Sequence, residues 1–175
     1  MAPFVIIAIG LIAATIHLFV SRTPRTADRV LALYLLYTLL LGVGIGGLFS
    51  AVGHLAFADR VAEQLGWPSG TGFQTEVGLF DLAFGVLGVC CIWFRDQWWN
   101  ATAIGWAIFG VGAAANHLLD VTEKGDSASG NVGSLVLDLV VPALLIGLLV
   151  ALRVAQRGRA PSVTAGAASS AAGGD

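Results

Sequence analysis

The stretch Trp67–Gly88, WPSGTGFQTEVGLFDLAFGVLG, decides how this chain is interpreted. Its first residues are rich in Pro, Gly and Ser, which is typical of a turn, and the remainder is an apolar helix. Two carboxylates, Glu76 and Asp81, and the amide of Gln74 interrupt the apolar run. If this helix lies in a lipid bilayer, these side chains are costly there and must have polar partners.

The composition of the whole chain is that of a membrane protein. Of its 175 residues, 57% are hydrophobic and 11% are charged, whereas about a quarter of the residues of a soluble domain are charged. The mean hydropathy is +0.83. The formal net charge of −2 and the lack of a basic domain give no reason to expect nucleic acid as a partner.

Five apolar segments are long enough to cross the hydrocarbon core, which takes about 20 helical residues. They cover residues 3–21, 29–52, 73–94, 101–119 and 132–152. No Lys or Arg precedes the first segment, so we expect it to remain as a span and not to be cleaved as a signal peptide. The sequence therefore predicts an all-α, polytopic transmembrane helix bundle over residues 1–157.

Basic residues set the orientation of the predicted bundle. Five crossings place seven of them on one side, namely Arg22, Arg25, Arg29, Arg95, Arg153, Arg157 and Arg159. The other side receives Arg60 and Lys124 together with several acids. The positive-inside rule then predicts that the N-terminus is outside and the C-terminus is cytoplasmic.

Two segments differ from the spans. Residues 51–66 place Asp59 and Glu63 on one helical face and His54 and Val61 on the opposite face. This pattern predicts an amphipathic helix, which either extends the second span or lies in the membrane interface. The tail, residues 158–175, consists mainly of Ala, Gly and Ser, and we expect it to be disordered in the cytoplasm.

Helical periodicity arranges the polar residues into stripes. In the third span one stripe holds Gln74, Gly78, Asp81, Gly85 and Gly88. Its glycines permit the close approach of another helix, so Asp81 is expected to point into that contact. Glu76 is about 140° from Asp81 on an ideal helix and faces a different neighbour.

The fourth and fifth spans carry similar stripes. They consist of Gly105, Phe109, Gly112, Asn116 and Asp120 in one span and of Asn131, Ser134, Asp138 and Pro142 in the other. His117 and Asp120 are three positions apart, so we expect Asp120 to orient one imidazole nitrogen. Pro142 cannot bond the carbonyl of Asp138 four residues earlier, which favours a polar opening there.

The predicted topology gathers these polar residues at one depth. The outer half holds His54, Gln74, Glu76, Asp81, Asn116, His117, Asp120, Asn131 and Asp138. His17 lies toward the inner end, where we expect Tyr34 or Tyr37 beside it. The sequence thus predicts an outward-facing polar pocket with Asp81, Asp138, Gln74 and Asn116 among its buried polar groups.

The run from Gly66 to Gly88 resembles a family of small, functionally uncharacterised bacterial integral membrane proteins. The resemblance rests on a Gly-Trp-Pro turn followed by a Phe-Gln-x-Glu-Val-Gly helix start, carried here by Gly66, Trp67, Pro68, Phe73, Gln74, Glu76, Val77 and Gly78. It implies a multi-pass protein of the bacterial inner membrane. It implies no activity.

The residues leave several functions open. One hypothesis is a divalent metal site formed by His54, Glu76, His117 and Asp120, because mixed His and carboxylate ligands suit Zn, Fe or Mn. A haem held by His54 and His117 is a less favoured variant.

Two other hypotheses need no metal. Asp81, Asp138 and Glu76 could titrate in a small proton-coupled transporter, which with five spans would act as a homo-oligomer. Alternatively, the chain is a non-catalytic subunit of a larger membrane complex. An enzyme is the least supported reading, since no nucleophile–base pair, phosphate loop or metalloprotease helix is present.

Overall fold

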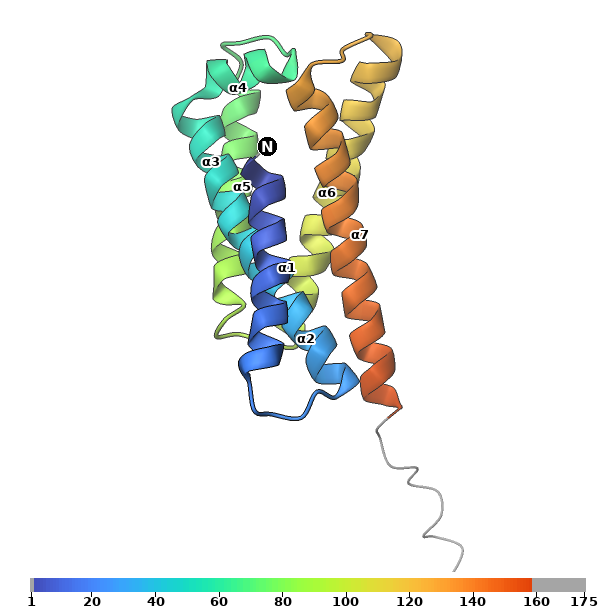
Figure 1. Ribbon diagram of the computed structural model, residues 1–175. Helices are drawn as coiled ribbons and strands as arrows, with labels where there is room; N and C mark the ends of the chain where they lie inside the picture. Colours follow the sequence, from blue (N-terminus) through green and yellow to red (C-terminus); the bar gives the residue numbers. More distant parts are fainter. Residues whose placement is uncertain (1, 159–175) are drawn as a thin grey trace, which may run out of the picture.

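The computed structural model describes residues 2–158, and every regular element within them is a helix (Figure 1). The elements are α1 (Ala2–Val20), α2 (Ala27–Tyr37), η1 (Thr38–Ile45), α3 (Gly46–Ala56), α4 (Ala58–Leu65), α5 (Phe73–Cys90), α6 (Gln97–Glu123) and α7 (Ser129–Arg157). The tail predicted to be disordered lies, beyond Gly158, outside the described residues.

Five helices of the described chain are long and apolar enough to cross a membrane, which confirms the predicted fold class. They cover Pro3–Val20, Ala27–Ala56, Phe73–Cys90, Gln97–Glu123 and Ser129–Arg157. The second of these is continuous from α2 through η1 into α3. The last two exceed the predicted segments at both ends, because polar residues such as Gln97 and Arg157 extend the helices past their apolar centres.

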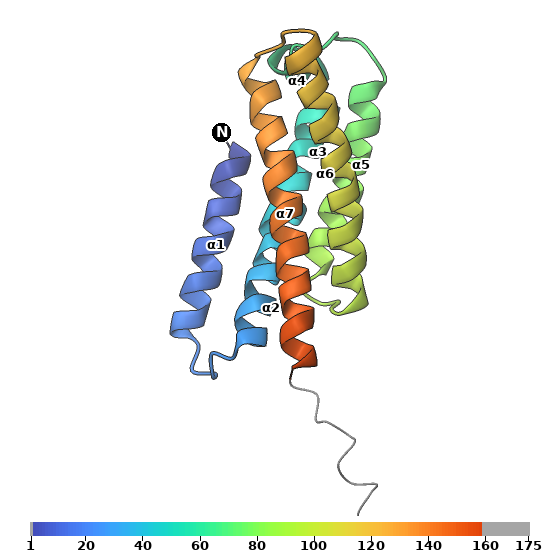
Figure 2. The same cartoon turned by 90° about the vertical axis from the view of Figure 1, so that its right-hand side faces the viewer.

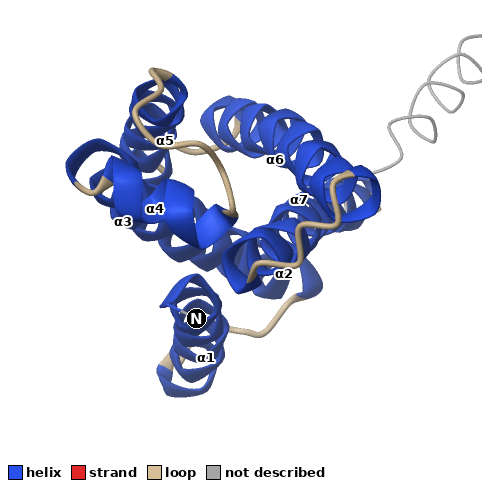
Figure 3. Ribbon diagram, turned by 90° about the horizontal axis from the view of Figure 1, so that it is seen from above, coloured by secondary structure: helices blue, strands red, loops and turns tan. Residues whose placement is uncertain are grey.

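The helices form two groups, with α3 and α5 in one and α6 and α7 in the other (Figures 1 and 3). Helix α5 packs on α3 and η1, while α6 packs mainly on α7. Helices α5 and α6 follow each other in the chain, but their backbones come close at few points and they meet mainly through side chains. Helix α2 packs on α7 at the end of the bundle where α7 finishes. Helix α1 lies at the periphery of the bundle against α2 and η1 (Figure 2).

The predicted glycine stripe of the third span is confirmed in α5. The buried residues of this helix are Gln74, Gly78, Asp81, Gly85 and Gly88. A Cβ atom added to Gly88 would lie 2.5 Å from the backbone nitrogen of Gly44, and one added to Gly85 would lie 2.8 Å from that of Leu48. The α5 backbone therefore rests directly on η1 and α3, and Asp81 is part of this contact surface.

The eight-residue π-helix η1 has no counterpart in the sequence analysis. A π-helical segment widens the turn by one residue and often accompanies a functional site. Gly42 of η1 and Gly46, the residue that follows it, both lie on the wall of the cavity described below. The wide π-helical turn, and the lack of side chains at Gly42 and Gly46, leave room at this point of the bundle.

The segment predicted as an amphipathic helix is divided at Phe57. Residues up to Ala56 continue the second span as α3, and α4 forms a separate amphipathic helix after the break. Helix α4 ends at Gly66, which has φ +73° and permits the sharp return into the Trp67 turn. A Cβ atom at Gly66 would also lie 2.3 Å from Oδ2 of Asp126, so the turn packs tightly on the connection between α6 and α7.

Candidate functional site

A cavity of about 500 Å³ lies between the two helix groups, in the half of the bundle next to α4. Its lining includes side chains from α1, α3, α5, α6 and α7 and from the turn after α4. The polar lining residues are Ser50, His54, Asp81, Asn116, His117, Ser134 and Asp138. Most of the rest of the wall is apolar or aromatic, including Trp67, Phe73, Trp106 and Phe109.

Stacked aromatic rings hold α5 and α6 apart and create this space. The ring of Phe80 on α5 stacks on that of Phe109 on α6, with 3.9 Å between the centroids. Phe84 occupies the position beside Gly105, where an added Cβ would lie 2.7 Å from the ring. The stripe predicted on the fourth span thus faces α5 and the cavity, whereas α6 meets α7 through another face that includes Gly110.

Asp81 forms the α5 wall of the cavity. Its side chain is buried, with 3% of the residue exposed, and its polar neighbours are Ser50 and His54 of α3. Nδ1 of His54 lies 2.6 Å from Oε1 of Gln74, one turn before Gly78 on the same α5 stripe. The α3–α5 contact therefore carries Gln74 and Asp81, which the periodicity of α5 placed on this face, together with the partly buried Ser50 and His54 of α3.

His117 and Asp138 form the opposite wall. Oδ1 of Asn131 accepts a hydrogen bond from Nδ1 of His117, while Nδ2 of Asn131 donates to the backbone carbonyl of Asp126 at 3.0 Å. Because a carbonyl can only accept, the Asn131 amide is fixed and Nδ1 of His117 must carry a proton. Nε2 of His117 lies 3.7 Å from Oδ2 of Asp138 and faces that carboxylate.

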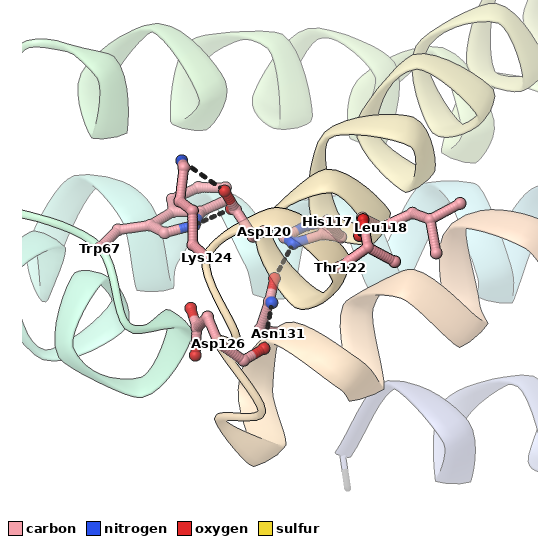
Figure 4. A network of polar contacts seen from close by, with 8 residues as sticks. All are labelled: Trp67, His117, Leu118, Asp120, Thr122, Lys124, Asp126 and Asn131. Atoms are coloured by element: carbon pink, nitrogen blue, oxygen red, sulfur yellow. Dashed lines mark hydrogen bonds and ion pairs between the residues drawn. The ribbon is translucent and has the colours of Figure 1, made fainter.

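Trp67 covers this wall from the turn between α4 and α5 (Figure 4). Its indole stacks on the imidazole of His117, with 5.1 Å between centroids and 8° between planes. Nε1 of the same indole donates to Oδ2 of Asp120 at 2.7 Å, and Lys124 binds the other carboxylate oxygen. The Asp120 carboxylate raises the pKa of the exposed Lys124 ammonium above its usual value.

The predicted bond between Asp120 and His117 is therefore wrong. Both oxygens of Asp120 bind other groups, and both nitrogens of His117 face Asn131 and Asp138. The two side chains are neighbours on α6, but the large ring of Trp67 stacks on the imidazole and directs its own N–H to the carboxylate.

The structure does not bring the four predicted metal ligands together. His54 and His117 line the cavity, Asp120 is outside its lining, and Glu76 is exposed on the other side of α5. Within residues 2–158, no three His, Cys, Asp or Glu side chains form a group that could hold a metal ion. The physical reason is that Glu76 lies on another face of α5, and that Trp67 and Lys124 bind both carboxylate oxygens of Asp120.

Other predicted residues are placed as follows. Asn116, which was predicted to be buried, is an exposed residue that lines the cavity beside His117, whereas Gln74 lies behind His54 with only 1% of its surface exposed. His17 is exposed, although its place among the polar residues of the spans had led us to expect that it is buried; it is remote from the cavity, and its Nδ1 lies 3.1 Å from the hydroxyl of Tyr37, one of its two expected neighbours. Trp67 was not predicted as a site residue. Its position directly after Gly66 in a polar turn is the sequence feature that could have indicated such a role.

The chain belongs to a family of unknown function, DUF6790, which matches residues 1–158. This agrees with the resemblance to an uncharacterised family. No curated protein and no solved structure matches the chain. The cavity and its residues are therefore the features that point to a function.

Proposed function

We propose that this member of a family of unknown function is a multi-pass membrane protein that binds a small molecule in the cavity between its helices. The observation that carries the proposal is the cavity of about 500 Å³ with Asp81 on one wall and Asp138 on the other. Ligand pockets in proteins commonly measure about 300–1,000 Å³ and combine an apolar lining with a few polar groups. Ionisable residues within spanning helices mark functional sites by default, because their insertion is costly.

The surface of the bundle supports the membrane part of the proposal. Large apolar side chains are exposed along the outer faces of the long helices, for example Ile12, Phe19, Val111 and Val150, each more than half exposed. In water such a surface would be strongly unfavourable, whereas lipid tails solvate it.

The charges at the two ends of the bundle support an orientation. The described arginines Arg22, Arg25, Arg29, Arg95, Arg153 and Arg157 lie at the end where α1, α5 and α7 finish (Figure 1). The end with α4 holds mostly acids. We propose on this basis that the basic end faces the cytoplasm of a bacterium and that the cavity is nearer to the outer surface of its inner membrane.

Photolabelling tests whether the cavity admits a small molecule. An uncharged aryl diazirine is added to the purified chain in lipid nanodiscs, and labelled residues are identified by mass spectrometry. We expect adducts on the lining residues Val77, Phe109 and Leu137 in addition to adducts on lipid-facing side chains. The lining adducts should disappear in Gly112→Trp, because an added side chain at Gly112 has open space in the cavity.

Gly147→Trp is the matched control for this experiment. Gly147 also has no atom within 4 Å of an added Cβ, but it is exposed on the outside of α7 and does not line the cavity. Its labelling pattern on the lining residues should equal that of the wild type. Lining residues that remain unlabelled in the wild type, or that are labelled equally in Gly112→Trp, would refute the proposed binding function.

One observation favours a second candidate, proton-coupled transport by an oligomer. His117 and Asp138 face each other at 3.7 Å and both line the cavity, so a proton exchanged between them would be coupled to its contents. Proteoliposomes with an internal pH dye test this candidate. Substrate-dependent proton flux in the wild type and its loss in Asp138→Asn would support it, and equal flux in the two proteins would reject it.

A further inference from the structure

We infer that the cavity takes an organic cation with an apolar body, held between the carboxylates of Asp81 and Asp138. This assignment rests on the proposed small-molecule binding and names the ligand class of the same site. It follows from the charge, the aromatic lining and the geometry of the cavity.

The charge of the lining is one-sided. The described lining residues include Asp81 and Asp138 but neither Lys nor Arg. The basic side chains on the wall are His54 and His117; the Nδ1 atom of each is held in a hydrogen bond to an amide oxygen, and Nε2 of His117 faces Asp138 at 3.7 Å. Asp81 and Asp138 line the same cavity, so their carboxylates repel each other as like charges. A positive charge between two carboxylates in an apolar cavity relieves that repulsion, whereas an anion would increase it.

The uncharged part of the wall fits the body of such a ligand. Trp67, Phe73, Trp106 and Phe109 come from three different parts of the chain and present aromatic rings to one space. The faces of aromatic rings attract ammonium groups, and sites for quaternary ammonium ligands combine several of them. Aliphatic side chains such as Val77, Leu137 and Val141 complete a lining that suits hydrocarbon groups.

The geometry favours an organic cation over a metal ion. A metal ion such as Mg²⁺ or Ca²⁺ requires about six or more oxygen ligands, and the ion releases its hydration shell only in exchange for them. No three acidic, His or Cys side chains of the described chain form such a group. A weakly hydrated ammonium needs no set of directed ligands, so two carboxylates and several rings are sufficient for it.

Two probes of the same shape test the assignment. Benzyltrimethylammonium carries a permanent positive charge, and neopentylbenzene replaces its nitrogen with carbon. The full-length chain in nanodiscs is titrated with each probe, and binding is measured by calorimetry and by the fluorescence of its tryptophans, two of which line the cavity. We expect the cation to bind at least about tenfold more tightly than the neutral probe, which corresponds to about 1.4 kcal/mol.

Substitutions locate the bound charge. Asp81→Asn and Asp138→Asn keep the side-chain shape and remove the charge, so each should weaken binding of the cation about tenfold or more and leave the neutral probe nearly unchanged. Glu76→Gln is the matched control, because Glu76 is an exposed carboxylate of the same helix as Asp81 and does not line the cavity. Its affinity for the cation should equal that of the wild type.

The results separate the ligand class from the binding function. Equal affinity for both probes, with both lost in Gly112→Trp, would overturn the cation assignment and leave small-molecule binding intact. Absence of binding by the cation, or binding that Asp81→Asn and Asp138→Asn do not change, would also overturn it. The comparison of the two probes on the wild-type chain remains decisive even if a variant fails to fold. Photolabelling with the uncharged diazirine tests the binding function independently.

Discussion

The indole of Trp67 and the imidazole of His117 lie almost parallel, 5.1 Å apart, although 50 positions of sequence separate them. Trp67 belongs to the turn between α4 and α5, and His117 belongs to α6. The contact therefore joins the two helix groups at the α4 end of the cavity. The backbones of α5 and α6 come close at few points, so this contact is one of the links between the groups. The hydrogen bond from the same indole to Asp120 fixes the ring in this position.

Trp67→Phe should lower the free energy of unfolding by about 1.5–3 kcal/mol, the usual contribution of a hydrogen bond to a charged group. The substitution keeps an aromatic ring over His117 but removes the Nε1 donor to Asp120. Chemical unfolding in detergent, followed by circular dichroism, measures the change. Trp93→Phe is the control, since Trp93 is 68% exposed. Equal losses in the two variants would argue against the importance of the Trp67–Asp120 bond.

Gly88→Ala should destabilise the fold by about 1–3 kcal/mol, because its Cβ would meet the backbone of Gly44 at 2.5 Å and force α5 away from η1. Gly147→Ala makes the same chemical change inside a helix at a position with open space. It should leave the stability unchanged or raise it by up to about 1 kcal/mol through helix propensity. Thermal unfolding of both variants checks the prediction, which fails if Gly88→Ala is as stable as the wild type.

Asn131→Leu should cost about 1–3 kcal/mol of stability for each group left without its partner. Asn131 is fully buried and serves both Nδ1 of His117 and the carbonyl of Asp126, neither of which Leu can satisfy. Asn116→Leu on α6 is the comparison, because Asn116 is exposed to the cavity and should tolerate the change. Unfolding in denaturant distinguishes the two, and a stable Asn131→Leu protein would contradict the assigned network.

Single cysteines test the orientation in the membrane. In a background with Cys90→Ala and Cys91→Ala, Ser69→Cys places a thiol at the α4 end and Thr23→Cys places one at the basic end, both on exposed residues. An impermeant maleimide should label Ser69→Cys in intact cells and Thr23→Cys only after the membrane is opened. The reverse pattern would show that the chain is inserted the other way round.

Much of the fold could be predicted because it depends on local properties of the sequence. Length and hydropathy alone define helices that can span the bilayer. The helical repeat places Gln74, Gly78 and Asp81 on one face of α5, and the small size of the glycines makes that face a contact surface. The π-helix η1 was not foreseen, since its wide turns follow from packing against α5 and α1 and leave no pattern in TLLLGVGI.

The partners of the polar residues could not be predicted from the same pattern. His54 meets Gln74 across 20 positions, His117 meets Asn131 across 14, and Trp67 meets Asp120 across 53. Periodicity shows which face of a helix a residue occupies but not which helix lies opposite. For the same reason the structure does not bring the four predicted metal ligands together, because they lie at a similar depth but on different faces and contact different partners.

The sequence by itself determined the helical fold, the burial of Asp81 on a glycine-lined face and the position of Glu76 on another face of the same helix, because helix geometry and hydropathy act over neighbouring residues. Only the tertiary structure decided which walls of the cavity Asp81 and Asp138 form and that Trp67 lies at one end of it. That arrangement arises because the stacked rings of Phe80 and Phe109 separate α5 from α6, and such long-range packing has no signature within either helix.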